Sequence, residues 1–261
     1  MKLKGLYIIF IFSVLGSVQA QDVSSDFNLY SGYSLNFRVD EKLKLKIGNL
    51  ICFNTDSIKL QYVQSKIGFS YRNTKKVTTS LAFSPMFFKG KTKSIWYQKL
   101  SGSLSHSSKL FGFRMKNAVS VEWHFPKLSK YQFRVIYSLK YAFKNKILPM
   151  RMTPYITYKL YYYAGGNPLN YYDEAHENIV ETNAPNDFHR YRIGGGIRFR
   201  PIKHFYISVF YLFQQEFNTT FMKNKQINIL NDKQTAIKYP FNDYQGVGIS
   251  FSYSITNKNY K

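Results

Sequence analysis

The residues best suited to chemistry lie within one short stretch of the chain. Ser120, Glu122 and His124 alternate with other residues, so in an extended strand their side chains project from the same face. A serine, a histidine and an acidic residue are the partners of a hydrolase triad. Residues two apart on one strand are separated by about 6.5–7 Å, too far for direct hydrogen bonds unless the strand bends. We therefore keep an enzyme open as an alternative and assign no catalytic residue.

The cysteine and the histidines indicate no further site. Cys52 is the single cysteine and no histidine lies near it in sequence, so we interpret it as a free thiol rather than a nucleophile. The five histidines include no i, i+4 pair with a glutamate between them, the spacing typical of zinc-dependent hydrolases. The sequence therefore predicts no metal site and no cofactor.

The strong positive charge of the chain indicates which classes of binding partner to consider. The 261 residues include 37 Lys+Arg and 14 Asp+Glu, which gives a formal net charge of +23. Such a charge is typical of proteins that bind nucleic acids or anionic membranes. Aromatic residues make up 18% of the chain and hydrophobic residues 44%, so we do not expect intrinsic disorder.

Residues 1–20 have the pattern of a cleaved secretory signal peptide. Lys2 and Lys4 precede the apolar run Leu6–Leu15, and small residues stand before a cleavage site that follows Ala20. An uncleaved membrane anchor is the alternative. Export makes a nucleic-acid partner unexpected, and removal of the two lysines lowers the formal net charge to +21.

The rest of the chain, residues 21–261, alternates between apolar and polar side chains over most of its length. Clear examples are residues 27–39, 131–143 and 247–255, where apolar residues occupy nearly every second position. Eleven such runs occur, most of them about nine to fifteen residues long. Strands of soluble proteins average about five to six residues, whereas strands that cross an outer membrane need about nine to eleven. The run lengths favour a transmembrane β-barrel over the alternative of a secreted β-sandwich or β-solenoid.

The strand number and the loops define the expected architecture. Bacterial outer-membrane barrels close with an even number of strands, so eleven runs predict a single antiparallel transmembrane β-barrel of about twelve strands, with ten as second choice. The connections Ala164–Asp187 and Asn218–Asn242 are long and rich in loop-forming residues. We expect both to face the cell exterior, because outer loops exceed periplasmic turns in length. No second domain is expected within residues 21–261.

The face opposite the apolar one concentrates the positive charge and is predicted to line the lumen, the interior of the barrel. Its candidate residues are Arg114, Arg134, Lys140, Arg190, Arg192 and Arg198, together with the acidic Glu122 and Glu216; Lys116, Lys159 and Arg200 share the same face. A narrow passage with a positive lining attracts anions. The alternative is a lumen that these large side chains fill.

Three segments of the chain resemble a known family. Met152–Tyr162, Phe188–Asn218 and Asn242–Ser254 are similar to domain-of-unknown-function family 2490, whose members look like exported barrels of Bacteroidota-type bacteria. The most specific feature is an Arg-rich strand, a turn with a basic residue, and an aromatic strand that ends in Gln214–Glu216. The resemblance implies an outer-membrane β-barrel. The family carries no established activity, so no functional residue is transferred.

These patterns together predict a porin-like barrel in the outer membrane of a Gram-negative bacterium. The expected role is a narrow channel or transporter for small anionic solutes, with outer-membrane lipid and lipopolysaccharide as further partners. A structural or surface-interaction barrel with a blocked lumen is the first alternative, and a lipid-modifying outer-membrane enzyme is the second.

Overall fold

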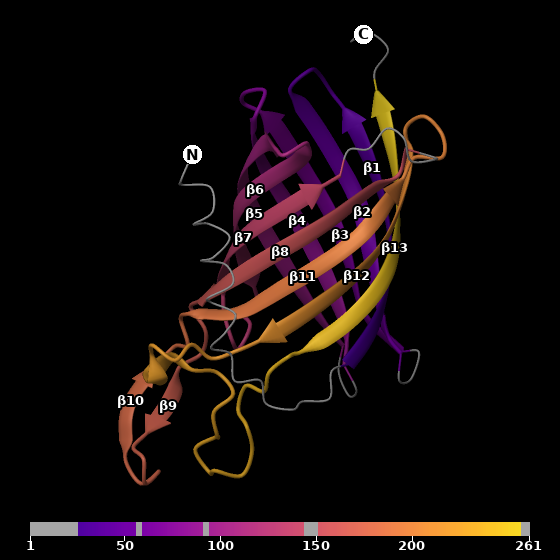
Figure 1. The fold of residues 1–261 in the computed structure, drawn as a ribbon. Coiled ribbons are helices and arrows are strands. Elements are labelled where there is room, and N and C mark those ends of the chain that lie inside the picture. Colours follow the sequence, from indigo (N-terminus) through magenta and orange to yellow (C-terminus); the bar gives the residue numbers. More distant parts are fainter. Residues whose placement is uncertain (1–25, 56–58, 91–93, 144–150, 257–261) are drawn as a thin grey trace.

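The protein folds as a closed β-barrel with a small loop region at one end (Figure 1). The computed structural model describes residues 26–55, 59–90, 94–143 and 151–256. The predicted signal peptide, residues 1–20, lies outside the described residues. The barrel confirms the all-β, single-barrel architecture predicted from the alternation. Among the described residues, no helix is long and apolar enough to cross a membrane.

Eleven strands form the barrel wall. In chain order they are β1 (Asp26–Arg38), β2 (Leu43–Asn54), β3 (Lys59–Arg72), β4 (Val77–Lys89), β5 (Ser94–Leu110), β6 (Phe113–Phe125), β7 (Phe133–Ala142), β8 (Thr153–Ala164), β11 (Phe188–Phe199), β12 (Phe205–Glu216) and β13 (Tyr244–Thr256). Strands that follow one another in this list pair with each other, and the first strand pairs with the last. Ten of the strands run for 12 residues or more, and the eleventh, β7, has 10.

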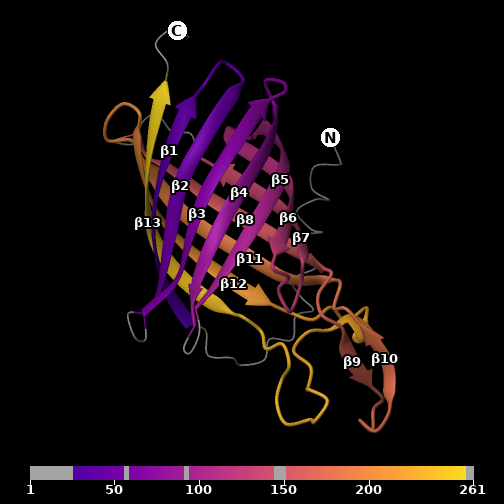
Figure 2. The ribbon, with the colours of Figure 1, turned by 180° about the vertical axis from the view of Figure 1, so that it is seen from behind.

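The barrel closes through a parallel pair. β1 and β13 pair in parallel, in register from Asp26↔Tyr244 to Arg38↔Thr256, and they lie side by side in both ribbon views (Figure 2). An antiparallel barrel needs an even number of strands, but one parallel pair allows an odd number to close. The barrel is therefore mixed rather than wholly antiparallel and has eleven strands, one fewer than the expected twelve.

Small residues make room for large rings at this closing pair. A Cβ added to Gly248 would lie 2.4 Å from the ring of Phe210 and 2.6 Å from the Cβ of Tyr30. A Cβ added to Gly246 would lie 2.7 Å from the ring of Tyr30. Glycine at these positions lets the aromatic side chains of the neighbouring strands lie against the backbone of β13.

The alternation places apolar side chains on the outside of the barrel. On β13, for example, the outward residues Val247, Ile249, Phe251, Tyr253 and Ile255 are 37% to 42% exposed. Outward residues of the other strands, such as Leu81 and Val119, show the same exposure of large apolar groups. A wide apolar surface of this kind is unusual for a water-soluble monomer.

The weakest part of the sequence pattern contains the longest strand. β5 spans 17 residues but places Gln98 and Gly102 in its outward row, opposite apolar residues of β4 and β6. This polar interruption explains the unclear alternation there. No connection lies at Ser107–Lys109, because these residues belong to β5. The chain turns instead at Phe111 and Gly112, both of which have positive φ, as the two central residues of a type I′ hairpin turn do.

The two long connections lie at the same end of the barrel, as predicted, and pack together. Residues 165–187 contain the hairpin of β9 (Leu169–Tyr172) and β10 (Ile179–Asn183), and residues 217–243 contain a 3₁₀ turn, η3 (Lys223–Lys225). Their shared core consists of Leu169, Tyr171, Ile227 and Tyr239. We call residues 165–187 and 217–243 the loop module. It projects from the barrel at the end where β1 begins (Figures 1 and 2).

Candidate functional site

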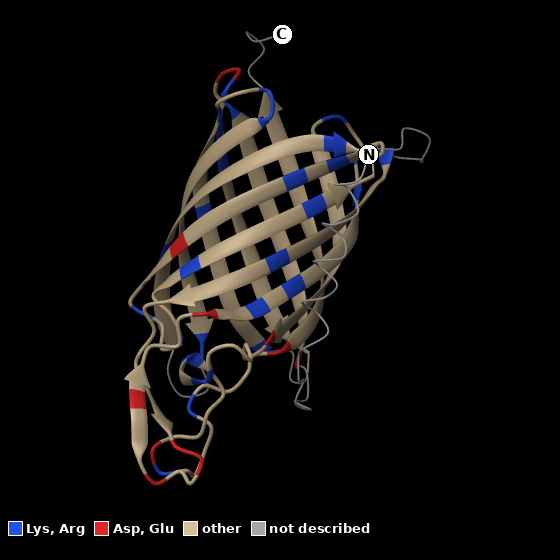
Figure 3. Ribbon diagram, turned by 60° about the vertical axis from the view of Figure 1, so that its left-hand side comes forward, with Lys and Arg blue, Asp and Glu red and all other residues tan. Residues whose placement is uncertain are grey.

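The structure places the predicted lumen residues in two groups along the barrel. Glu122, Arg134, Arg190, Arg192 and Glu216 lie in the half near the loop module, and Arg114, Lys140 and Arg198 lie near the short turns at the opposite end. Lys and Arg recur along the strands, whereas most Asp and Glu lie in loops or at strand ends (Figure 3). The excess of positive charge therefore runs through the barrel wall rather than being confined to its rims.

Glu122 on β6 is surrounded by basic side chains. Lys99 Nζ donates a 3.0 Å hydrogen bond to Glu122 Oε1, and Arg134 Nε donates a 2.9 Å hydrogen bond to Oε2. His124 Nε2 lies 3.5 Å from the same carboxylate. Strand register explains the cluster, because Lys99 on β5 pairs with His124, and Arg134 on β7 pairs with Glu122. One carboxylate thus serves two permanent cations, which leaves the cluster with a net positive charge.

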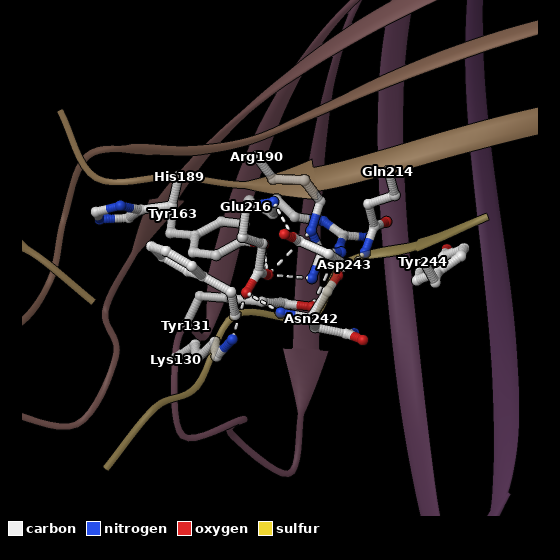
Figure 4. A network of polar contacts seen from close by, with 12 residues as sticks. Lys130, Tyr131, Tyr163, His189, Arg190, Gln214, Glu216, Asn242, Asp243 and Tyr244 are labelled. Atoms are coloured by element: carbon white, nitrogen blue, oxygen red, sulfur yellow. Dashed lines mark hydrogen bonds and ion pairs between the residues drawn. The ribbon is translucent and has the colours of Figure 1, made fainter. Parts of the chain in front are cut away.

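Glu216, at the end of β12, is the centre of a second cluster (Figure 4). Its carboxylate accepts a 3.1 Å hydrogen bond from Arg190 Nε, a 2.7 Å hydrogen bond from the Tyr163 hydroxyl, and a hydrogen bond from Lys130 Nζ. The backbone N–H of Asn242 donates a further hydrogen bond of 3.0 Å. Glu216 is only 1% exposed. A buried carboxylate with this many donors is fully engaged and leaves no acceptor for another cation.

Two groups outside the strands show the electrostatic effect of this cluster. Burial lowers the pKa of the Lys130 ammonium, although Glu216 beside it acts in the opposite direction. Burial raises the pKa of the Asp243 carboxyl, against the hydrogen bond that it accepts from the backbone N–H of Glu216. Burial therefore disfavours the charged form of both Lys130 and Asp243, which lie beside Glu216.

Arg192 on β11 differs from its neighbour Arg190. Its guanidinium donates hydrogen bonds of 2.5 Å to Gln214 Oε1 and 2.6 Å to the Tyr244 hydroxyl, both neutral groups. The guanidinium also lies 5.8 Å from the ring centroid of Tyr161, a ring that contacts Arg134 and Arg190 as well. Its Nε is buried and has no hydrogen-bond partner among the described residues. Arg192 is therefore held in place without being neutralised.

Two lysines of the lumen also lack a salt bridge within the described ranges. Lys66 on β3 and Lys159 on β8 make no salt bridge with any carboxylate in the described part of the chain. They interact electrostatically with each other, and their strands lie on opposite sides of the barrel. The lumen thus carries positive charge on facing walls at this level.

A cavity of about 800 Å³ connects these groups. Its lining extends from Asp26 and Lys89, at strand ends near the loop module, to Lys66 and Lys159 deeper in the lumen. Arg192 also belongs to its lining. This volume falls within the range of about 300–1,000 Å³ that is typical of small-molecule sites.

The remaining predicted lumen residues lie outside the cavity. Lys140 Nζ lies 3.8 Å from the ring centroid of Tyr155, and Arg198 Nε donates a 3.5 Å hydrogen bond to the Ser208 hydroxyl. Arg114 pairs in register with Lys109. These residues do not line the cavity, so the structure separates them from the group around Arg192.

Three basic residues of the site were absent from the predicted set. Lys66 lies on the polar face of its run, and this parity is the signal that could have identified it. Lys99 lies in β5, where the interrupted alternation hid its direction. Lys130 lies between β6 and β7, outside any periodic segment, so only the tertiary structure reveals its contact with Glu216.

The possible triad is not assembled. His124 Nε2 lies 3.5 Å from Glu122 Oε2, which is closer than the spacing along a strand suggests. Among the described residues, however, Ser120 makes no hydrogen bond with either of them, and it pairs across the strands with Ser103 and Ile136. Cys52 is fully buried and donates a hydrogen bond to Gln61 Oε1, the surroundings of a structural thiol.

No group of three or more His, Cys, Asp or Glu side chains in the described ranges is arranged to hold a metal ion. No family model matches the chain, and no curated protein matches it significantly. The resemblance to domain-of-unknown-function family 2490 therefore stays a prediction. The geometry of the barrel and its lumen is therefore the basis on which a function can be proposed.

Proposed function

We propose that the protein is an exported outer-membrane β-barrel that admits small anionic solutes into a narrow, positively charged lumen. A single observation carries this proposal. The lumen carboxylates Glu122 and Glu216 are each engaged by two basic side chains, which leaves Arg192, Lys66 and Lys159 without a salt bridge to a carboxylate among the described residues. In a narrow space of low dielectric, such uncompensated charges favour anions and oppose cations.

The outer surface supports a membrane location. Rows of outward apolar residues surround the barrel, and strands of 10 to 17 residues are long enough to span an outer membrane. Residues 1–20 supply the signal for export. We orient the loop module toward the cell exterior, where lipopolysaccharide is the adjacent anionic lipid. The protein should fractionate with outer membranes and migrate differently on gels before and after boiling; recovery as a water-soluble protein would refute the location.

Conductance in planar bilayers tests the proposed role. The purified protein should give pores whose reversal potential in a salt gradient indicates selectivity for anions. Neutralising Lys159 with Lys159→Gln should reduce the selectivity, whereas Glu122→Gln should increase it. The matched control is Lys75→Gln, because Lys75 lies in the turn between β3 and β4, outside the lumen. An insulating barrel, or a selectivity that is the same in the wild type and the two lumen variants, would overturn the proposal.

A second candidate is a structural barrel that contacts partners through its loop module. The observation that favours it is the exposure of large apolar residues there: Val180 is 69% exposed and Phe221 is 91% exposed. The buried ion pairs around Glu122 and Glu216 would then keep the lumen closed. An insulating barrel whose melting temperature rises with lipopolysaccharide would support this candidate, and an unchanged melting temperature would count against lipid binding.

A further inference from the structure

We propose that the cavity of about 800 Å³ near the loop module binds a small organic anion in which a planar ring is joined to a carboxylate or phosphate group. This inference rests on the proposed function and names the class of solute. It requires basic groups for the negative charge, a surface for the ring, and polar atoms that have no partner within the described part of the protein. The cavity provides all three.

The binding site for the negative charge is formed by Arg192, Lys159 and Lys66. The three side chains line the cavity and come from β11, β8 and β3. The other lining cations near them, Lys99 and Arg134, already donate hydrogen bonds to Glu122. A guanidinium offers five N–H donors in a fixed plane, suited to carboxylate and phosphate oxygens. We therefore assign the anionic group of the ligand to Arg192, and the two lysines add further positive charge around it.

The surface for the ring lies on the wall that runs from β1 to β5, which also carries Lys66. Four aromatic side chains form a continuous row: Tyr30 and Tyr62 have ring centroids 6.5 Å apart, Tyr62 and Phe88 5.3 Å, and Phe88 and Tyr97 5.5 Å. All four line the cavity. They come from β1, β3, β4 and β5, whereas Arg192 and Lys159 come from the neighbouring strands β11 and β8. Aromatic pairs gain stability beyond simple burial, so a planar ring is favoured over an aliphatic chain on this wall.

Two buried polar atoms point to a ligand with both a donor and an acceptor. Asn28 is only 3% exposed, yet its Oδ1 has no hydrogen-bond donor among the described residues. Arg192 Nε has no acceptor in the same part of the chain. Both residues line the cavity. Buried polar groups without partners are costly, and a polar ligand bound between the two walls would satisfy them.

Calorimetric binding to the full barrel in lipid nanodiscs tests the inference, with empty nanodiscs as the blank. Three probes separate the two parts of the site: 6-hydroxy-2-naphthoate (the naphthoate) has the ring, a hydroxyl donor and the charge, 6-hydroxy-2-naphthamide (the naphthamide) has the ring and the hydroxyl without the charge, and acetate has the charge without the ring. We expect saturable binding of one naphthoate per barrel, affinity for the amide at least about tenfold lower, and no saturable binding of acetate.

Substitutions locate the site within the lumen. Arg192→Gln should lower the affinity for naphthoate by about tenfold or more. The matched control is Arg198→Gln, because it removes the same charge from the same strand outside the cavity; its affinity should stay within about twofold. Tyr62→Leu should lower the affinity by about threefold to tenfold through loss of ring packing. If Arg192→Gln fails to fold by the gel-shift assay, Lys159→Gln provides the same test.

The outcomes distinguish this inference from the proposed function. Binding of naphthoate by a barrel that conducts no ions would support the binding site and overturn the channel. Anion-selective conductance without naphthoate binding would overturn the binding site alone. Equal binding of naphthoate and naphthamide, or equal losses in the Arg192 and Arg198 variants, would also overturn it.

Discussion

Arg190 and Glu216 face each other as register partners on β11 and β12, and Arg190 Nε donates a 3.1 Å hydrogen bond to Glu216 Oε1. Arg190 is 7% exposed and Glu216 is 1% exposed, so water does little to screen the pair. Lys130, from a different part of the chain, binds the same carboxylate. This relationship ties the loop between β6 and β7 to the end of β12.

Glu216→Gln should destabilise the barrel by about 3–5 kcal/mol, because it leaves two basic side chains near one another without a counter-charge. Urea titration of the refolded protein in micelles or vesicles would measure the loss. Glu174→Gln is the matched control, since Glu174 is exposed in the loop module, and it should leave the unfolding midpoint unchanged. An equally small effect of both substitutions would show that the cluster contributes little to stability.

Gly248→Ala should destabilise the closing pair by about 1–3 kcal/mol, the usual cost of an overpacked site. The added Cβ would collide with the ring of Phe210 and with Tyr30. Gly102→Ala on β5 is the control, because a Cβ there meets no atom within 4 Å. The free energies of unfolding of the two variants should therefore differ clearly; tolerance of Gly248→Ala would argue against the close approach of β1 and β13.

A disulfide should form between β1 and β13 when Ser34 and Ser252 are both replaced by cysteine in a Cys52→Ser background. The two residues are register partners, and their hydroxyl oxygens lie 3.1 Å apart, a separation that suits the short Cβ–Cβ distance of a disulfide. Gel mobility under oxidising and reducing conditions reports the cross-link. The control pair is Ser34→Cys with Ser80→Cys, since Ser80 lies on the non-adjacent strand β4. Failure of the first pair to cross-link would contradict the parallel closure.

Asp243→Asn should stabilise the folded barrel increasingly as the pH rises above about 4. Burial raises the pKa of Asp243 above its ordinary value of 3.8. Its stabilising contribution is therefore complete below the unfolded pKa and is lost as the pH rises through the folded value. Unfolding midpoints measured from pH 3 to 8 should show the wild-type protein falling below the variant.

Asp40→Asn provides a control of opposite sign. The backbone N–H groups of Leu43 and Lys42 donate hydrogen bonds to Asp40 and lower its pKa. Its contribution is present above the unfolded pKa and is lost as the pH falls through the folded value. The Asp40→Asn variant should therefore be less stable than the wild type at neutral pH and converge with it in acid. The same pH trend in both variants would refute the assignment for Asp243.

The sequence by itself determined most of the strands and the two faces of the barrel. Alternation is a local property, because successive side chains of any extended strand point in opposite directions. It therefore identified the inward positions of Arg134, Arg190 and Arg192 and the apolar outer surface. It also located both long loops, since loop-forming residues interrupt the alternation there.

Only the tertiary structure decided how the barrel closes and which charges remain free. The parallel pairing of β1 with β13 joins segments more than 200 residues apart, as between Ser34 and Ser252, and no local pattern encodes it. Lys130 and Glu216 are 86 positions apart in the chain, so their contact depends on the register of all the strands between them. That register engages Glu122 and Glu216 with particular cations and leaves Arg192, Lys66 and Lys159 around one cavity, because a carboxylate neutralises only the charges that lie within a few ångströms of it.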